Sequence, residues 1–493
     1  MTPDARVSRA TAGSVRIRAV GAAFPMLRLP AAAVTAAWGR GGGRGQTSVC
    51  AHDEDVLTLS AEAAARALES AGLDAGAIDG LWWGTSRPPF AEGPSHAVLA
   101  AAIGLEPNST GALLSGSPHA GIEALLAAAD AITAGSARTA LVVAADSLRP
   151  GLGSGFEARS GAGAAAYILT AADVAGGDAG ALIGARVTRT HPFLDRYRGD
   201  GELSTRDVYD ARLFREEIFL PPVREVGEHL ATLEPTAWSL PDPDGRLGGI
   251  AATQLGARGA VASDAVSKAV GDTGAAAALL GAIAGLDAAG TVAVIATGGG
   301  RTTGVALVAD HAVPGAGTLQ HLLEQGNETT YPEVLRARTE LVPSGESVPM
   351  GVPPESAMFV RGATEMLTLL AGRCADCGTL NTPPSIHPMC LSCGGTKFET
   401  VPLARRGVVH TFVVNRTMPA PFVAPLGIAV VDLDDGARIM LQVVGDGDDI
   451  VIGAAVDLVL RRYAHERGVP VYGLKVRIRP EPAGVDGTPT EEQ

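Results

Sequence analysis

The sequence has few cysteines, few aromatic residues and no excess of positive charge. Five cysteines occur among 493 residues, and four of them lie between 374 and 393. This number and this clustering exclude a secreted scaffold held together by disulfides. Lysine and arginine total 39 against 53 aspartates and glutamates, and the net charge of −14 opposes binding to nucleic acid.

Long apolar runs are missing as well. No stretch reaches the roughly 18 apolar residues that a membrane-spanning helix needs. The Ala-rich segment 121–134 is shorter and contains Glu123 and Asp130. Residues 1–14 are polar, unlike a secretory signal. We therefore expect a soluble, cytoplasmic protein with no membrane partner.

The residues that are present indicate a folded, closely packed protein. Hydrophobic residues make up 46% of the chain and charged ones 19%, far from the composition of disordered chains. The 63 glycines and the 4% share of aromatics predict a core of small side chains. The length allows two to four domains.

Helix and strand patterns alternate over 15–310, which predicts an α/β fold with a parallel sheet. The continuous apolar runs at 139–144 and 164–170 are typical of strands buried on both faces. The other expected elements of the first half are strands at 15–20 and 78–84, a helix at 54–71 ending at Gly72, and a helix at 118–134.

The second half repeats this order. A helix at 264–285 and strands at 291–296 and 304–308 follow the same pattern as 118–170. The repeat predicts a duplicated fold of two βα layers about a pseudo-two-fold axis. Between the halves, 190–233 is richer in charged and aromatic residues, which suits a capping insertion.

Beyond 310 the organisation changes. Residues 311–356 are rich in proline, glycine and charge, and we interpret them as a linker. Residues 357–398 predict a helix followed by a zinc ribbon. Over 399–482 the sequence predicts an OB-type β-barrel, with strands at 408–414, 427–431, 438–443 and 456–461.

Four cysteines predict a zinc site. Cys374 and Cys377 form one C-x-x-C pair, and Cys390 and Cys393 form a second pair, separated from the first by the twelve residues 378–389. Two such pairs supply four thiolates to one tetrahedral Zn²⁺ and leave no position open for water, so the site is expected to be structural. His387 is either an additional ligand or an ordinary loop residue.

Several segments of the large domain resemble the thiolase superfamily, and more narrowly HMG-CoA synthase and ketosynthase III. The segments that carry the likeness are 53–64, 81–86, 120–125 and 140–147. Residues 357–482 are similar to the acyl-CoA-associated zinc-ribbon/OB proteins that accompany thiolases. The resemblance implies a duplicated thiolase-like fold over 15–310, joined to a C-terminal zinc ribbon and OB barrel.

The resemblance also implies catalytic positions, and the chain departs from the family at each of them. Pro118 stands where the family has its nucleophilic Cys, and Pro241 or Asp242 stands where it has His. Asp272 replaces the Asn, and Ser86 replaces the acidic residue of the synthases. The remaining thiol, Cys50, lies outside this region.

Two interpretations of the helix start remain open. In one, Ser117 caps the helix, Pro118 begins it and His119 packs in the core. In the other, Ser117 or His119 faces an acyl-thioester pocket, and Asp272 orients His119 or acts as a base. Gly298, Gly299 and Gly300 either bring backbone N–H groups near the thioester or allow two chain segments to pack closely.

The resemblance implies an acyl-thioester enzyme that works without the usual Cys. The expected chemistry is C–C bond formation or cleavage, or acyl transfer, as in an acyltransferase or an aldolase or Claisen-type lyase of secondary or acyl-CoA metabolism. The thioester is carried by CoA or by the phosphopantetheine of a carrier protein, and a homodimer is expected. The alternative is a non-catalytic scaffold that binds acyl-CoA and partners a separate, active thiolase or ketosynthase.

Overall fold

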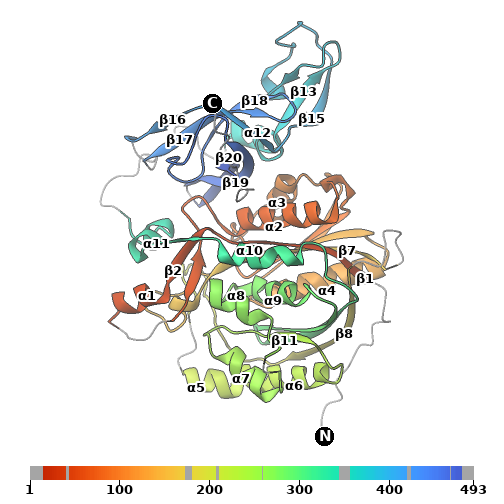
Figure 1. Ribbon diagram of the computed structural model, residues 1–493, viewed down its shortest axis with the longest axis vertical. Coiled ribbons are helices and arrows are strands. Elements are labelled where there is room, and N and C mark those ends of the chain that lie inside the picture. The colour runs from red at the N-terminus through yellow and green to blue at the C-terminus, as the bar shows by residue number, and fades with distance from the viewer. Residues whose placement is uncertain are drawn as a thin grey trace, which may run out of the picture. The chain divides into compact units, whose positions relative to one another are not determined.

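The computed structural model describes residues 15–39, 44–172, 180–206, 210–257, 259–342, 356–418, 424–466 and 468–479. The chain divides into two compact units, Met1–Pro343 and Ser344–Gln493, which we call unit 1 and unit 2 (Figure 1). None of the helices in these ranges combines the length and the apolar character needed to cross a membrane.

Unit 1 is built on one nine-stranded sheet. From edge to edge its strands are β5 (Thr110–Ser115), β4 (Gly80–Thr85), β6 (Thr139–Ser147), β7 (Ala162–Ala171), β1 (Val15–Ala23), β8 (Ala181–Thr190), β11 (Arg301–Ala309), β10 (Gly290–Gly298) and β9 (Ala237–Ser239). Only two residue pairs, Arg16–Leu182 and Ile17–Ala181, join β1 to β8. The sheet therefore consists of two halves with a narrow junction.

The prediction of a parallel sheet is wrong, because the sheet is mixed. β4 runs parallel to β5 and β6, and β9 runs parallel to β10. The pairs β6–β7, β7–β1, β8–β11 and β10–β11 are antiparallel. A parallel pair needs a crossover, usually a helix. The connection 148–161 between β6 and β7 contains only the short 3-10 turn Glu157–Arg159, so the chain turns back on itself.

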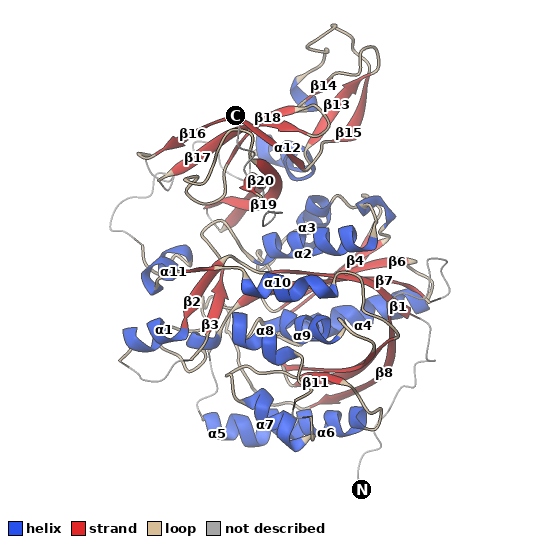
Figure 2. Cartoon of the chain, in the orientation of Figure 1, coloured by secondary structure: helices blue, strands red, loops and turns tan. Residues whose placement is uncertain are grey.

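The predicted duplication is confirmed. Helix α4 (Ala120–Thr133) leads into β6 and β7 as helix α9 (Ala277–Gly285) leads into β10 and β11. These two helices contact one another between the halves of the sheet (Figure 2). Helices α2 (Val56–Ala71) and α3 (Ser95–Ile103) cover one outer face, and α6 (Leu220–Ala231) and α7 (Leu247–Gln254) cover the other (Figure 1). The result is a five-layered α/β arrangement.

Small residues let the central layer pack at backbone distance. Along α4 the buried positions include Ala120, Gly121 and Ala124. A Cβ atom on Gly121 would overlap the carbonyl oxygen of Ala275 in the segment before α9. The core of small side chains expected from the composition is therefore present at the centre of unit 1.

Local signals account for α2. Asp55 accepts hydrogen bonds from the backbone N–H groups of Leu57 and Thr58, and the Thr58 hydroxyl accepts from Asp55 N. Gly72 ends the helix with φ 61°, a conformation that glycine adopts without strain. The helix and its glycine end are as predicted, with a start two residues later.

The two central helices differ from their predicted extents. α4 begins at Ala120, because Ser117 first closes a turn in which its carbonyl accepts from Ala120 N at 3.1 Å. The helix predicted over 264–285 is broken into α8 (Ser263–Val270) and α9. Gly271, with φ 80°, interrupts it and places Asp272 outside any helix.

The linker predicted over 311–356 is wrong for residues 311–342, which fold into unit 1. They form α10 (Leu319–Glu324), β12 (Asn327–Glu328) and α11 (Tyr331–Ala337). β12 pairs with β2 (Leu27–Pro30), which also pairs with β3 (Gln46–Val49), and Tyr331 and Val334 pack with Leu29 and Val34. The segment is polar on average, but its few apolar side chains, such as Tyr331 and Val334, are buried against unit 1. Residues 343–355 of the predicted linker lie outside the described residues.

Two short helices complete the outer parts of unit 1. α1 (Ala31–Ala37) follows β2, and α5 (Ala211–Leu213) leads through a π-helical turn, Phe214–Phe219, into α6. In the predicted capping insertion, α6 buries Val223, Val226 and Leu230 in the outer layer. The segments that precede it, 191–206 and 211–219, contribute side chains to two cavities.

Unit 2 contains a ribbon and a barrel. α12 (Ala357–Thr368) precedes the ribbon strands β13 (Leu370–Cys374), β14 (Leu380–Asn381) and β15 (Phe398–Pro402). The barrel strands are β18 (Arg438–Gln442), β17 (Leu426–Leu433), β16 (Arg406–Asn415), β19 (Ala455–Glu466) and β20 (Val469–Ile478), in that order. A bridge from Val443 to Val476 brings the two edges together. The predicted OB-type barrel is thus nearly closed, and β20 is a strand that the sequence pattern did not reveal.

Candidate active site and metal centre

The four cysteines of the ribbon converge. Their Sγ atoms all lie within 4.8 Å of one another, and the pairs Cys374–Cys393 and Cys377–Cys390 are 3.6 Å apart. A tetrahedron of thiolates around zinc, with bonds of about 2.3 Å, has sulfur–sulfur edges of about 3.8 Å. The geometry therefore suits a four-coordinate zinc ion. His387 is not part of the cluster.

A buried asparagine holds the two halves of the cluster together. Asn381 donates to the carbonyls of Gly372 and Thr379, and its Oδ1 accepts from Leu391 N at 2.9 Å. Backbone N–H groups of Cys393 and Ser392 lower the pKa of Cys390 to about 6, whereas the neighbouring thiols of Cys377 and Cys374 raise the pKa of Cys393. Four thiols this close together can all be thiolates only when a cation balances their charge. Sequence spacing identified the ligands but gave no signal for Asn381.

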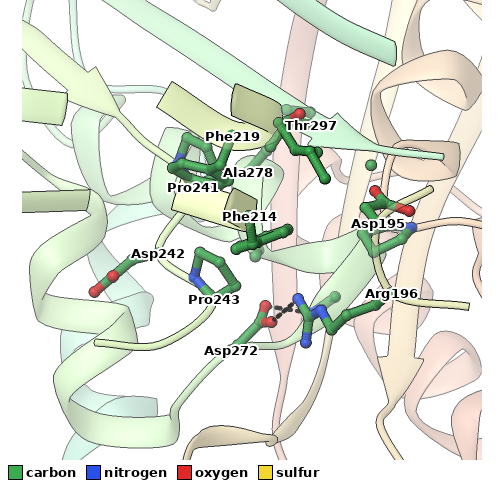
Figure 3. Close-up of a pocket in the computed structure, with 16 residues that line it drawn as sticks. Asp195, Arg196, Phe214, Phe219, Pro241, Asp242, Pro243, Asp272, Ala278 and Thr297 are labelled. Carbon is green, nitrogen blue, oxygen red and sulfur yellow. Dashed lines mark hydrogen bonds and ion pairs between the residues drawn. The ribbon is translucent and has the colours of Figure 1, made fainter. Parts of the chain in front are cut away.

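Several residues that the resemblance predicts for a catalytic site meet at one cavity in unit 1. It has a volume of about 50 Å³ and is lined by Pro118 before α4, by Pro241 and Asp242 after β9, and by Asp272 between α8 and α9 (Figure 3). Gly298, at the end of β10, lines it too. Residues far apart in the sequence are thus brought together, and none of these five carries a thiol or a hydroxyl group.

Asp272 is held from all sides. Its Oδ2 lies 2.8 Å from Arg196 Nη2, and its Oδ1 accepts from Gly274 N at 2.9 Å. The Asp272 backbone donates to Arg159 O at 2.7 Å and accepts from Gly161 N at 2.8 Å. Figure 3 shows the Asp272 carboxylate facing the Arg196 guanidinium. The negative charge of Asp272 is therefore balanced by an arginine.

Two further carboxyls line the same cavity, and burial raises the pKa of each. Asp195 accepts from Gly299 N at 2.8 Å, and Asp242 accepts from Gly248 N at 3.0 Å. In Figure 3 the Asp242 carboxylate points away from Pro243 and the rest of the cavity wall. Asp195 is therefore the better placed proton acceptor. It lies in the loop after β8, where no sequence motif marked it.

His119 does not face this cavity. It is buried, its Nε2 lies 2.8 Å from Thr303 Oγ1, and its Nδ1 lies 3.2 Å from Glu123 Oε1. Since the side chain of Asp272 bonds to Arg196 and Gly274 instead, the prediction that Asp272 orients His119 is wrong. The turn at Ser117 delays the helix start and directs His119 onto β11.

Parts of the chain are similar to known proteins. Residues 400–461 match the family model described as ChsH2, C-terminal OB-fold domain. The chain is 38% identical over 156 residues to the hydroxymethylglutaryl-CoA synthase of Thermococcus sibiricus and 35% identical to that of Pyrococcus horikoshii. Each match covers 31% of this chain and 45% of the relative, so the chain spans less than half of the length of these relatives.

Solved structures extend the likeness over most of unit 1. MvaS in complex with 3-hydroxy-3-methylglutaryl coenzyme A aligns with a TM-score of 0.59 at 18% identity, covering 69% of this chain and 94% of that one. FabH from Pseudomonas aeruginosa, a 3-oxoacyl-(acyl carrier protein) synthase III, aligns with a TM-score of 0.52 at 22% identity, covering 60% and 98%. Unit 1 has the thiolase-like fold. Unit 2 adds an OB-fold domain to it.

A second cavity adjoins the first in the thiolase-like unit. Its volume is about 160 Å³, and it shares Pro118 and Arg196 with the first cavity. Ser86 and Ser117, two of the residues predicted for the site, line this second cavity. The Ser117 hydroxyl also accepts from His119 N at 3.2 Å, so it has both a structural role and access to the cavity.

The triple-glycine turn packs against the start of α4. A Cβ on Gly298 would meet the ring of Pro118, and one on Gly299 would meet the side chain of Ser117. All three glycines, including Gly300, have positive φ angles of 154°, 60° and 73°. Close packing of two segments explains the glycines, and Gly298 at the same time lines the first cavity.

Asp146 bonds to residues beside both cavities: Ser86 lines the second, and Ala275 follows Gly274, which lines the first. This buried carboxyl, at the end of β6, accepts from Thr85 Oγ1 and Ser86 N at 2.9 Å and from Ala275 N at 2.7 Å. Burial raises its pKa to about 6, although these hydrogen bonds oppose the shift. The apolar run 139–144 ends before Asp146, and the sequence pattern did not indicate that this carboxyl would be buried as well.

Proton uptake by Asp146 predicts that the thiolase-like unit becomes more stable as the pH falls below 7. The folded state binds the proton with a pKa near 6, whereas the unfolded chain does so near 3.8. Between pH 7.5 and 5.5 this linkage adds about 1 kcal/mol to the free energy of unfolding. Asp146→Asn removes the titration, so denaturant unfolding at the two pH values should give a flatter dependence for the variant. Equal dependences in both proteins would contradict the prediction.

Proposed function

We propose that this protein processes acyl-thioesters, carried by CoA or by a carrier protein, and that it forms or cleaves C–C bonds without an acyl-cysteine. The observation that carries the proposal is the first cavity, where Pro118 stands at the nucleophile position beside the Asp272–Arg196 pair. Relatives are named as hydroxymethylglutaryl-CoA synthases, and one similar structure holds a coenzyme A thioester.

Asp195 is the proposed general acid and base. In a retro-aldol step its carboxylate accepts the proton of a β-hydroxyl group as the Cα–Cβ bond breaks to give a carbonyl. The electron pair of that bond passes to the thioester enolate, which then takes up a proton. Such a step forms no acyl-enzyme, and burial raises the pKa of Asp195 toward the range where a carboxyl exchanges protons at neutral pH.

The substitution Asp195→Asn tests this proposal. It keeps the size of the side chain and removes the proton acceptor, so turnover of the best acyl-CoA substrate should fall by about 10²-fold or more. The measurement is steady-state release of product from a panel of acyl-CoAs and β-hydroxyacyl-CoAs, followed by mass spectrometry. Intact protein should carry no acyl adduct during turnover.

Asp264→Asn is the control for this experiment. Asp264 lies on α8, pairs with Lys268 on the surface and lines neither cavity, so its loss should leave turnover unchanged. Equal activity of Asp195→Asn and the native chain would refute the role of Asp195. An acyl adduct on Cys50 of the native protein during turnover would refute the Cys-independent route, and an adduct on another side chain would refute the step without an acyl-enzyme.

The alternative is a non-catalytic partner of a separate thiolase or ketosynthase. It is favoured by Pro118, because this one residue removes the nucleophile from an otherwise thiolase-like fold. Absence of turnover with every thioester, together with stable co-purification of an active thiolase, would support this alternative. Turnover by the isolated protein would exclude it.

We further propose a homodimer and a structural zinc ion, in a cytoplasmic protein of acyl-CoA or secondary metabolism. β5 forms one edge of the nine-stranded sheet, and Thr110, Gly111 and Ala112 are exposed there. An open edge of this kind can pair with the same strand of a second copy. Four thiolates fill the coordination sphere of a zinc ion and leave no position for water or substrate, which supports a structural rather than a catalytic zinc site.

A further inference from the structure

The second cavity of the thiolase-like unit is unusually rich in arginine. Arg87, Arg149, Arg196 and Arg198 all line it, and among the described residues no acidic side chain does. The whole chain carries a net charge of −14, so a positive site within it is a local arrangement rather than a reflection of composition. Serine and threonine hydroxyls also line this cavity: Ser86, Ser117, Ser147, Ser160 and Thr205.

Acidic groups around the cavity balance only part of this charge. Arg196 is paired with Asp272, and Arg149 Nη2 lies 3.6 Å from Glu340 Oε1. Arg149 also donates to a backbone carbonyl through Nη2, but its buried Nε has no hydrogen-bond partner in the part of the chain that is described. One donor of the cluster is therefore left without an acceptor.

The other two arginines form no ion pair among the described residues. Arg87 donates to the carbonyl of Leu203, and Arg198 donates to the carbonyl of Glu202 at 3.0 Å. Burial and the neighbouring charges of Arg149 and Arg198 lower the pKa of Arg87 to about 10. The free protein thus holds like charges close together at a cost that a bound anion would remove.

We propose that this second cavity binds an oxyanion, a carboxylate or a phosphate group of the substrate. This inference rests on the proposed function, because it specifies which charged group of the acyl-thioester substrate is bound. Pro118 and Arg196 belong to both cavities, so an acyl chain whose thioester reaches Pro118 can place a charged group among the arginines. Guanidinium groups bind carboxylate and phosphate through paired hydrogen bonds, and serine hydroxyls supply further donors.

The two sources of the anion predict different ligands. If the anion is a carboxylate on the acyl chain, the preferred substrates are thioesters of dicarboxylic acids. If it is a phosphate of the carrier, acyl groups without charge are accepted equally well. Both sources use the same cluster, and both are open to direct measurement with small anions.

The test measures binding of inorganic phosphate and of glutarate to the full-length protein by isothermal titration calorimetry at constant ionic strength, with propionate and chloride as comparison anions. Binding of phosphate, of glutarate or of both, tighter than that of chloride and propionate, is expected. Arg198→Gln should weaken that binding about tenfold or more. Arg198 is exposed, so this variant should fold. Arg87→Gln provides a second variant of the cluster.

Arg212→Gln is the matched control. Arg212 is a highly exposed arginine of the same unit that pairs with Glu216 on the surface, and its loss should leave anion binding unchanged. Equal, weak binding of all four anions by the native protein would overturn the inference. If acyl-CoA turnover persists in that case, the proposed function stands without it; if anions bind but no thioester reacts, the proposed function fails and the anion site remains.

Discussion

Removal of the proposed zinc ion is expected to unfold the ribbon of unit 2. The three strands β13, β14 and β15 are short, and Ala371, Cys374 and Cys390 are among the few buried side chains in them and their connections. Metal binding contributes on the order of 10–16 kcal/mol in structural zinc sites, far more than so small a core supplies. We expect Cys390→Ser, or treatment with a strong chelator, to abolish hydrogen-exchange protection over residues 370–402. This loss is measured by hydrogen exchange with mass spectrometry, and the zinc content is measured in parallel.

Cys50→Ser separates this effect from a general loss of thiols. Cys50 belongs to unit 1 and lies outside the metal cluster, so its substitution should change neither the zinc content nor the protection of the ribbon. Retention of full protection over 370–402 after the metal has left would show that the strands hold without it.

A large loss of stability is expected when one methyl group is added to Gly121 in α4. In Gly121→Ala the new Cβ overlaps the carbonyl oxygen of Ala275 and presses on the side chain of Ala144. Neither neighbour can turn aside, since one is backbone and the other lies on a central strand. We expect the free energy of unfolding of the thiolase-like unit to fall by at least about 2 kcal/mol. Thermal or denaturant unfolding measures this change.

Gly249→Ala is a matched control with the opposite sign. Gly249 is an exposed helical glycine of α7, and a Cβ there would meet no atom within 4 Å. Alanine is the better helix former, so this variant should gain up to about 1 kcal/mol. A similar change in both variants would refute the close approach of α4 to the segment before α9.

Much of the fold was predictable because its signals are local. Apolar runs marked the buried strands, Gly72 marked a helix end, and the cysteine spacing marked the metal ligands. Strand direction was not predictable in the same way. Whether β7 runs with or against β6 depends on the path of the connection 148–161, and composition does not specify that path.

The candidate site was predictable in position more than in detail. The resemblance placed Pro118, Asp242 and Asp272 in one site, and these residues do line one cavity. Their partners could not be foreseen. Arg196 and Asp195 come from an insertion whose loops carry no periodic pattern, and their roles depend on contacts across more than 70 residues of sequence.

The break between α8 and α9 places residue 272 in a segment that backbone hydrogen bonds hold in position. Residue 272 is tied to Arg159 and Gly161 through its backbone alone, in a bridge that uses no atom of its side chain. Any residue except proline, which lacks the N–H that donates to Arg159 O, can therefore occupy this position without loss of those bonds. A substitution at residue 272 therefore changes the charge of the first cavity and removes the contacts to Arg196 and Gly274, while the backbone bonds that fix the position of this segment remain.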